Sequence, residues 1–199
     1  MKKIMFNDKY GLTTSVLKGK KTMTRRTIKD VNLLQYLNEL DDDGALKSIK
    51  GTIISESNSR YKVGEIVAVA QSYESMANGG YLDRMTVPAD NAVGFEFKLE
   101  YCGGGYKNKM FVAADLMPHH IRITDIKVER MQDISEEDCL KEGVFQSSWN
   151  RFYKYTFRHS KKKYHTANEA FAVLIDKVSG KYTWKSNPWV FAYTFELID

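Results

Sequence analysis

Alternating hydrophobic and polar positions predict several short strands distributed along the chain. Phe95 and Phe97 alternate with charged residues, which is typical of a strand with one buried face. Residues 66–70 form an apolar run, which indicates a buried strand. The alternation in 121–130 changes phase near Asp125 and predicts a bulge or the start of a second face. The predicted strands cover residues 2–6, 20–28, 66–70, 95–99, 109–114, 121–130 and 189–198.

Hydrophobic residues at helical spacing predict four helices between these strands. Leu12, Val16 and Leu17 form an apolar stripe that ends at Gly19, a natural helix stop. Ser135 opens a segment that resembles a capping box, which predicts a second helix start. The predicted helices cover about 9–18, 33–40, 136–142 and 168–178. Because strands outnumber helices and are scattered along the chain, we expect an α+β fold with a mixed β-barrel rather than a doubly wound parallel sheet.

Length and composition predict one globular domain that spans residues 1–199. The chain is 43 % hydrophobic and 13 % aromatic, which is sufficient for a packed core. Its 30 Lys and Arg against 25 Asp and Glu give a net charge of +5, which suits an anionic partner without requiring one. Cys102 and Cys139 form no CxxC pair, so reduced thiols are expected. We find no signal peptide and no apolar run of membrane-spanning length, so the sequence predicts a cytoplasmic protein without a membrane partner.

A basic segment after the first predicted helix is the strongest candidate for chemistry. Residues 19–26 carry four cations and two hydroxyl groups after a helix stop. In a strand, Thr22, Thr24 and Arg26 would point to one face, whereas the direction of Lys21 is not fixed by strand parity. Arginine donors and a mobile lysine charge suit an anionic ligand. The alternative is a solvated basic edge strand that prevents aggregation.

Glu142 is a second candidate because it lies at the end of a predicted helix, directly before Gly143. A carboxylate at a helix C-terminus is electrostatically unfavourable, typically by ~0.3–1 kcal/mol. Such an acid is suited to act as a general base if it is also buried. The alternative is an ordinary exposed glutamate on a frayed helix end.

The basic segment resembles the GxKTxTxR signature of ASCH proteins, a branch of the PUA-like superfamily. Residues 61–67 resemble the turn and strand of that family, and residues 133–144 resemble its helix with a Glu-Gly ending. The C-terminal stretch from Phe171 resembles the larger ASCH-like proteins that are common in phages and prophages. The resemblance implies a PUA-like mixed β-barrel with short flanking helices and with insertions near 29–60, 75–118 and 145–166.

Some small ASCH proteins are amidohydrolases that deacetylate acetylcytidine with a Lys, a Thr and a Glu. The resemblance assigns these catalytic roles to Lys21, Thr24 and Glu142. Thr24 would attack or orient a water, Glu142 would carry the proton, and Lys21 would activate the threonine or stabilise the oxyanion. The ligand-binding residues implied beside them are Lys20, Thr22, Arg25 and Arg26. This chain departs from the small amidohydrolases in its insertions and in Arg25, which stands where they often have an apolar residue.

A second basic segment interleaves cations with aromatic residues between 152 and 164. Single-stranded nucleic acids are bound by such combinations, through phosphate contacts and base stacking. The alternative is a partly buried aromatic hairpin or helix with a solvated lysine face. The nucleic-acid-binding candidates here are Lys154, Tyr155, Arg158, Lys161, Lys162 and Lys163.

Three functions remain open at this stage. The first is binding of RNA or of a modified nucleotide or nucleoside in a basic cleft, and the second is an amidohydrolase acting on an acylated cytidine. The third is a non-catalytic, phage-type accessory protein. No cofactor is expected, and no metal is expected either, because the adjacent His119 and His120 lack further ligands at metal-binding spacing.

Overall fold

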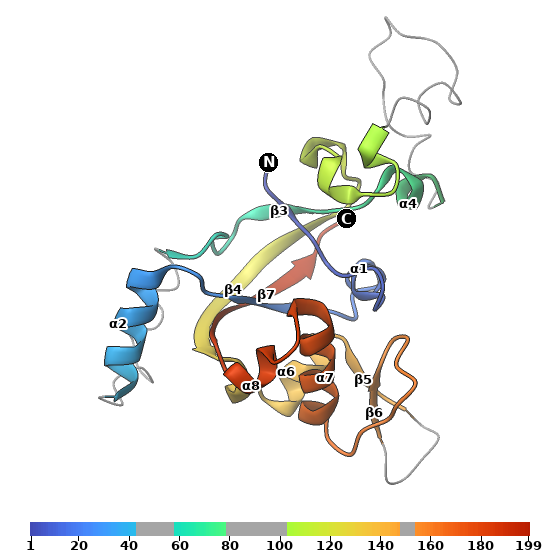
Figure 1. Ribbon diagram of the computed structural model, residues 1–199. Helices are drawn as coiled ribbons and strands as arrows, with labels where there is room; N and C mark the ends of the chain where they lie inside the picture. The colour runs from blue at the N-terminus through green and yellow to red at the C-terminus, as the bar shows by residue number, and fades with distance from the viewer. Residues whose placement is uncertain (43–57, 79–102, 148–153) are drawn as a thin grey trace, which may run out of the picture. The chain divides into compact units, whose positions relative to one another are not determined.

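The computed structural model describes residues 1–42, 58–78, 103–147 and 154–199 (Figure 1). The chain divides into two compact units. The first comprises Met1–Phe6, Ile66–Ile121 and Leu197–Asp199, and the second comprises Asn7–Glu65 and Arg122–Glu196. The expectation of a single domain stays a prediction.

The first unit pairs β1 (Lys3–Ile4) with β3 (Ile66–Val69) in parallel, with Lys3 opposite Ala68. The helix α4 (Tyr73–Asn78) follows β3. Three 3₁₀ turns come next, η4 (Gly103–Gly105), η5 (Lys109–Phe111) and η6 (Ala114–Leu116). One cluster of buried apolar side chains in this unit comprises Ala68, Ala70, Met76, Val112 and Met117.

The strand predicted at 109–114 is wrong, because η5 and η6 occupy most of this segment. The side chain of Asn108 accepts a hydrogen bond from the amide of Met110 and so caps the first turn. The ammonium group of Lys3 donates hydrogen bonds to the carbonyl oxygens of Lys109, Met110 and Val112, at 3.2, 2.6 and 2.6 Å. Three carbonyl groups of this segment therefore converge on one cation, as a turn allows and an extended strand does not.

The second unit contains the antiparallel pair β2 (Met23–Thr27) and β7 (Trp189–Leu197), with Thr24 opposite Tyr193 and Arg25 opposite Ala192. Nearly all of β7 is buried, which explains why its sequence is apolar without alternation. Most of β4 (His120–Arg130) also lies here. Its Thr124 and Asp125 are both exposed, which confirms the predicted change of phase.

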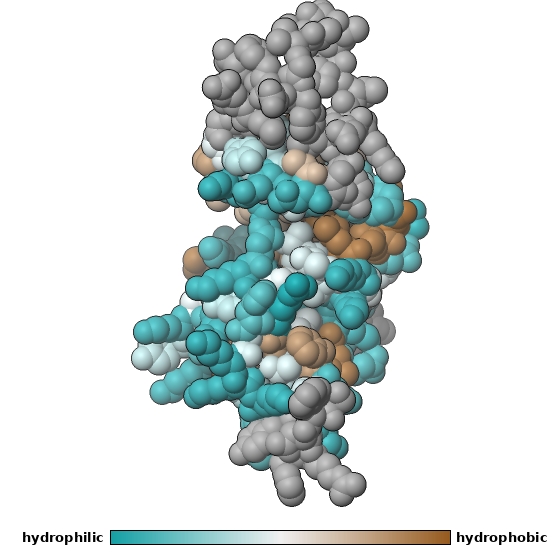
Figure 2. All heavy atoms as spheres, turned by 90° about the vertical axis from the view of Figure 1, so that its right-hand side faces the viewer, coloured by the Kyte–Doolittle hydropathy of each residue, from teal (hydrophilic) through white to brown (hydrophobic). Residues whose placement is uncertain are grey.

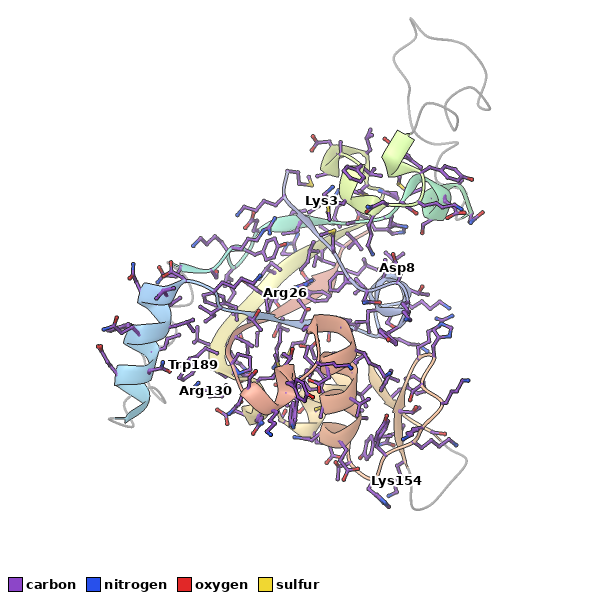
Figure 3. All side chains as sticks on the ribbon, in the orientation of Figure 1. Lys3, Asp8, Arg26, Arg130, Lys154 and Trp189 are labelled. Carbon is purple, nitrogen blue, oxygen red and sulfur yellow. The ribbon has the colours of Figure 1, made fainter. Side chains whose placement is uncertain are left out.

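Helices and a small hairpin complete the second unit, and they confirm the four predicted helices with shifted ends. The helices are α1 (Leu12–Leu17), α2 (Val31–Asp42), α6 (Glu136–Lys141), α7 (Ala167–Ser179) and α8 (Thr183–Ser186). A 3₁₀ turn, η7 (Met131–Asp133), follows β4. Antiparallel strands β5 (Val144–Gln146) and β6 (Tyr155–Phe157) form a separate two-stranded sheet. At the start of β7, the centroid of the Trp189 ring lies 4.2 Å from the guanidinium carbon of Arg130. Figure 3 labels both residues.

Within the second unit, β4, β7 and β2 are hydrogen-bonded neighbours in that order, and β2 and β7 run antiparallel. Together with the parallel pair β1–β3 of the first unit and with the helices, these strands are compatible with the predicted α+β class. The strands within the described ranges do not close into a barrel, and the strand predicted at 95–99 lies outside those ranges. Among the described helices, none has both the length and the apolar character needed to cross a membrane.

Candidate functional site

Two residues of the predicted catalytic trio are in direct contact within the second unit. The ammonium nitrogen of Lys21 lies 2.6 Å from Oε2 of Glu142, and their side chains are only 1 % and 6 % exposed. The same nitrogen donates to the backbone carbonyls of Met23, at 2.6 Å, and of Glu142, at 2.8 Å. Lysine has three donors, so these contacts account for all of them.

Arg25 holds the other oxygen of the same carboxylate. Its Nη1 lies 3.2 Å from Oε1 of Glu142, while its remaining nitrogens bind Glu129 and Asp138. The Arg25 side chain is fully buried, so the structure surrounds one guanidinium with carboxylates from β4 and α6. The donors of this predicted ligand-binding residue are thus engaged by the protein itself.

Local sequence signals bring Glu142 to this place. The hydroxyl of Ser135 accepts a hydrogen bond from the amide of Asp138 and begins α6, and Glu142 is its C-terminal capping residue. Gly143 then turns the chain with φ +112°, a conformation that favours glycine. A Cβ at Gly143 would lie 2.9 Å from Cδ2 of Leu12, so glycine also permits close packing of α1 there.

The negative end of the α6 dipole disfavours a carboxylate at Glu142, and the two cations offset this effect. Burial lowers the pKa of Lys21, although the neighbouring Glu142 carboxylate acts in the opposite direction. Burial also acts to lower the pKa of Arg25, but Glu142, Glu129 and Asp138 outweigh it and raise that pKa overall. The cluster is therefore a buried network of charges that stabilise one another.

Cys139 lies on α6 beside this cluster and is completely buried. Burial raises the pKa of its thiol to about 12. A thiol of this kind stays protonated at neutral pH and does not act as a nucleophile.

Thr24, the third predicted catalytic residue, lies on β2 between Met23 and Arg25 and is 5 % exposed. Within the described residues, no hydrogen bond joins its hydroxyl group to Lys21 or Glu142. Because side chains alternate along a strand, Thr24 shares a face of β2 with Arg26 and not with Arg25.

Arg26 is half-buried on that second face of β2 (Figure 3). Burial lowers its pKa, and the neighbouring Arg60 acts in the same direction, whereas Tyr61, Glu142 and Tyr193 act to raise it. The rings of Tyr61 and Tyr193 are buried and meet edge to face, with centroids 5.3 Å apart. The guanidinium carbon of Arg60 lies 5.6 Å from the centroid of the Tyr61 ring. Two arginines therefore lie next to a wall of two tyrosines.

The remaining candidates differ in their surroundings. Lys20 is exposed, and the amide of Thr22 donates to the carbonyl of Lys141 at 3.0 Å, which ties the start of β2 to the end of α6. In the second basic segment, Lys154, Arg158 and the three lysines at 161–163 are exposed, whereas Tyr155 is half-buried.

Sequence reasoning missed four residues of this site: Arg60, Glu129, Asp138 and Tyr193. Arg60, Glu129 and Tyr193 stand in no recognisable motif. Asp138 lies in the segment 133–144 that resembles the family helix, but its position there indicates a helix start and not a contact with Arg25. Glu129 and Asp138 are also separated from Arg25 by about a hundred positions. A buried arginine requires carboxylate partners, so burial of Arg25 would have indicated that such carboxylates exist, but not which ones they are. No set of three or more His, Cys, Asp or Glu side chains suited to a metal ion occurs in the described part of the chain.

No family model matches the sequence, and no curated protein matches it significantly. Among solved structures, the chain is similar to the crystal structure of protein EF3133 from Enterococcus faecalis V583, of the family DUF984. The TM-score is 0.35 at 12 % sequence identity, over 94 % of this chain and 67 % of the other. A similarity of this size does not assign the chain to a family.

Proposed function

We propose that this protein binds a nucleotide, a nucleoside or a segment of RNA next to β2, with Arg26 and Thr24 among the contacts. The observation that carries the proposal is the half-buried Arg26 beside Arg60 and the Tyr61–Tyr193 wall. Arginine presents a planar fork of donors that matches phosphate oxygens. Because both tyrosine rings are buried, they would form a wall of the site rather than an open stacking platform.

We further propose that the chain is a larger ASCH-like protein and that its complete fold is a PUA-like barrel. The support comes from residues 19–26, which resemble the family signature and lie on β2 and on the loop before it. The Glu-Gly ending of the family helix falls on Glu142 and Gly143, the residues that close α6. The two segments of the resemblance thus meet through the Lys21–Glu142 ion pair.

The binding proposal is tested with fluorescently labelled single-stranded RNA and with cytidine monophosphate, titrated at several salt concentrations. Loss of a charged hydrogen bond weakens binding by ~1.5–3 kcal/mol, so Arg26→Gln should reduce affinity for both probes by tenfold or more. Arg122→Gln is the matched control, since Arg122 is an exposed arginine on β4 that pairs with Glu196. Equal affinity of wild type and Arg26→Gln, with both variants folded, would refute the proposal.

A second candidate is an amidohydrolase that removes an acyl group from a modified cytidine. The observation that favours it is the buried contact of 2.6 Å between Lys21 and Glu142, a pair of the kind used in proton transfer and oxyanion stabilisation. In one route Thr24 orients a water that attacks the acyl carbonyl, Glu142 accepts the proton of that water and passes it to the departing amine of the base, and the acyl group leaves as a carboxylate. In the other route the hydroxyl group of Thr24 attacks the carbonyl and loses its proton to Glu142, the protonated amine leaves, and a water then hydrolyses the acyl-threonine ester. To stabilise the oxyanion, Lys21 would have to break one of its hydrogen bonds to a backbone carbonyl and donate to the substrate oxygen instead.

Hydrolysis of acetylcytidine, followed over time, tests this candidate. We expect turnover by the wild type and a loss of at least a hundredfold in Thr24→Val, which removes the hydroxyl group while keeping the shape of the side chain. Thr27→Val, at the end of the same strand, is the control. No turnover by the wild type, or equal turnover by Thr24→Val, would exclude the amidohydrolase and leave the binding proposal standing.

A further inference from the structure

The second basic segment forms a hairpin with a fixed turn. The backbones of Tyr155 and Tyr164 exchange two hydrogen bonds of 3.1 and 2.8 Å. The hydroxyl groups of Thr156 and Ser160 both donate to the carbonyl of Lys162, at 3.0 and 2.9 Å. The turn is therefore held in place by bonds to its own backbone. Its lysine side chains at 161–163 are all exposed.

The start of α1 packs against this hairpin and adds a further cation. A Cβ at Gly11 would collide with Cδ of Arg158, so the aliphatic part of the Arg158 side chain lies directly on the Gly11 backbone. The ring of Tyr10 meets Phe157 edge to face at 6.0 Å, and the ammonium nitrogen of Lys9 lies 5.9 Å from the centre of the Tyr10 ring. Lys9 thus belongs to the same region of the surface as the hairpin. We define the basic hairpin surface as Lys9, Arg158, Lys161, Lys162 and Lys163.

Among the residues that the structure describes, no acid neutralises the charges of this surface. Within the described ranges, no carboxylate forms an ion pair with any of its five cations. The nearby Glu169 accepts a hydrogen bond from the backbone of His165 instead. Figure 2 views the molecule from the side on which the β5–β6 hairpin lies in Figure 1, and hydrophilic side chains cover much of that face. Five unpaired positive charges on a rigid support produce a local positive potential that attracts polyanions.

The described aromatic residues of the hairpin, from Tyr155 onward, are buried or half-buried and pack against the protein itself. Phe157 is 1 % exposed and stacks on Tyr164 at a centroid distance of 6.2 Å with an interplanar angle of 14°. Tyr155 is half-buried, and its hydroxyl group interacts with Glu136 and Gln146. These aromatic side chains therefore form the support of the hairpin, whereas the side chains of Arg158 and of the three lysines are exposed. This arrangement suits contacts to phosphates, which carry no sequence information.

We infer that the basic hairpin surface binds the phosphate backbone of single-stranded RNA. The inference rests on the proposed function, since an RNA segment whose nucleotide occupies the site at Arg26 would have its flanking phosphates held elsewhere on the protein. Binding at this surface is electrostatic and independent of base sequence. A mononucleotide is too short to use it.

The test compares a triple variant, Lys161→Gln with Lys162→Gln and Lys163→Gln, with a control of the same charge change. The control combines Lys177→Gln, Lys181→Gln and Lys185→Gln. These three lysines are exposed, and they lie in the last turn of α7, between α7 and α8, and in α8. The probes are a labelled uridine dodecanucleotide and cytidine monophosphate. Each lost phosphate contact lowers the slope of log affinity against log salt by ~0.7, so the hairpin variant should lose up to about 2 from its slope.

At low salt, we expect the hairpin variant to bind the dodecanucleotide at least tenfold more weakly, while the control and the binding of cytidine monophosphate stay unchanged. An unchanged slope and affinity for the dodecanucleotide would overturn the inference, and the effect of Arg26→Gln would then report on the proposed function separately. If Arg26→Gln has no effect but the hairpin variant does, the inference stands and the site at β2 is refuted. Vesicles containing phosphatidylserine are a competing partner, and loss of vesicle binding without loss of RNA binding would also overturn it.

Discussion

Removing the carboxylate of Glu142 should strongly destabilise the fold, because this group neutralises two buried cations. At 2.6 Å the attraction between Lys21 and Glu142 is about 6 kcal/mol for an effective dielectric constant of ~20. Much of this attraction offsets the cost of moving both charges out of water. When one partner is removed, that cost remains for the other, and the loss is typically ~3–5 kcal/mol. For Glu142→Gln we expect about 3 kcal/mol, since the amide oxygen still accepts one hydrogen bond.

The same helix supplies a control. Lys141 and Glu137 form an ion pair of 2.7 Å, nearly the same length, but their side chains are 37 % and 76 % exposed. Exposed pairs at this spacing contribute only ~0.3–0.5 kcal/mol, so Glu137→Gln should change stability by about that amount. The difference between the two variants therefore measures the effect of burial.

Equilibrium unfolding in urea gives the free energy for each variant and for Lys21→Met alone and combined with Glu142→Gln. The combined variant should lose less than the sum of the single ones by at least about 1 kcal/mol, because neither charge is then left without its partner. Arg25 keeps Glu129 in all of them. A loss below about 1 kcal/mol for Glu142→Gln, or strict additivity in the cycle, would refute the view that the pair is buried and mutually dependent.

Three further predictions concern the surroundings of the site. Since burial raises the pKa of Cys139 from 9.0 to about 12, the unfolded chain releases this proton first as the pH rises. Stability should then fall above pH 9, by ~1.4 kcal/mol at pH 10, and urea unfolding of Cys139→Ala at pH 8 and 10 should lack this part of the decline. Gly143→Ala should be destabilised by about 1 kcal/mol more than Gly180→Ala, because both have φ near +115° but only Gly143 meets Leu12; equal melting temperatures would contradict this. Ser135→Ala removes the N-cap of α6 and should cost about 1 kcal/mol in the same unfolding assay, whereas no change would mean that the cap is not needed.

Where an element begins and ends was often readable from its own residues. The hydroxyl of Ser135 and the freedom of Gly143 act on their immediate neighbours, so they mark the two ends of α6 in the sequence as well as in the structure. The phase change at Asp125 is likewise a local property of β4. The strand predicted at 109–114 is wrong, and the partner of its carbonyl groups, Lys3, lies more than a hundred residues away, where no local pattern indicates it.

The pattern along the chain alone determined most helices and strands, the basic character of residues 19–26 and the unusual position of Glu142 at a helix end. The tertiary structure alone decided which charges meet, that Arg25 joins Glu129 and Asp138, and that Lys9 lies beside the hairpin. The reason is physical: backbone preferences and periodicity act over a few residues, whereas the burial that makes an ion pair necessary exists only after distant segments have packed together.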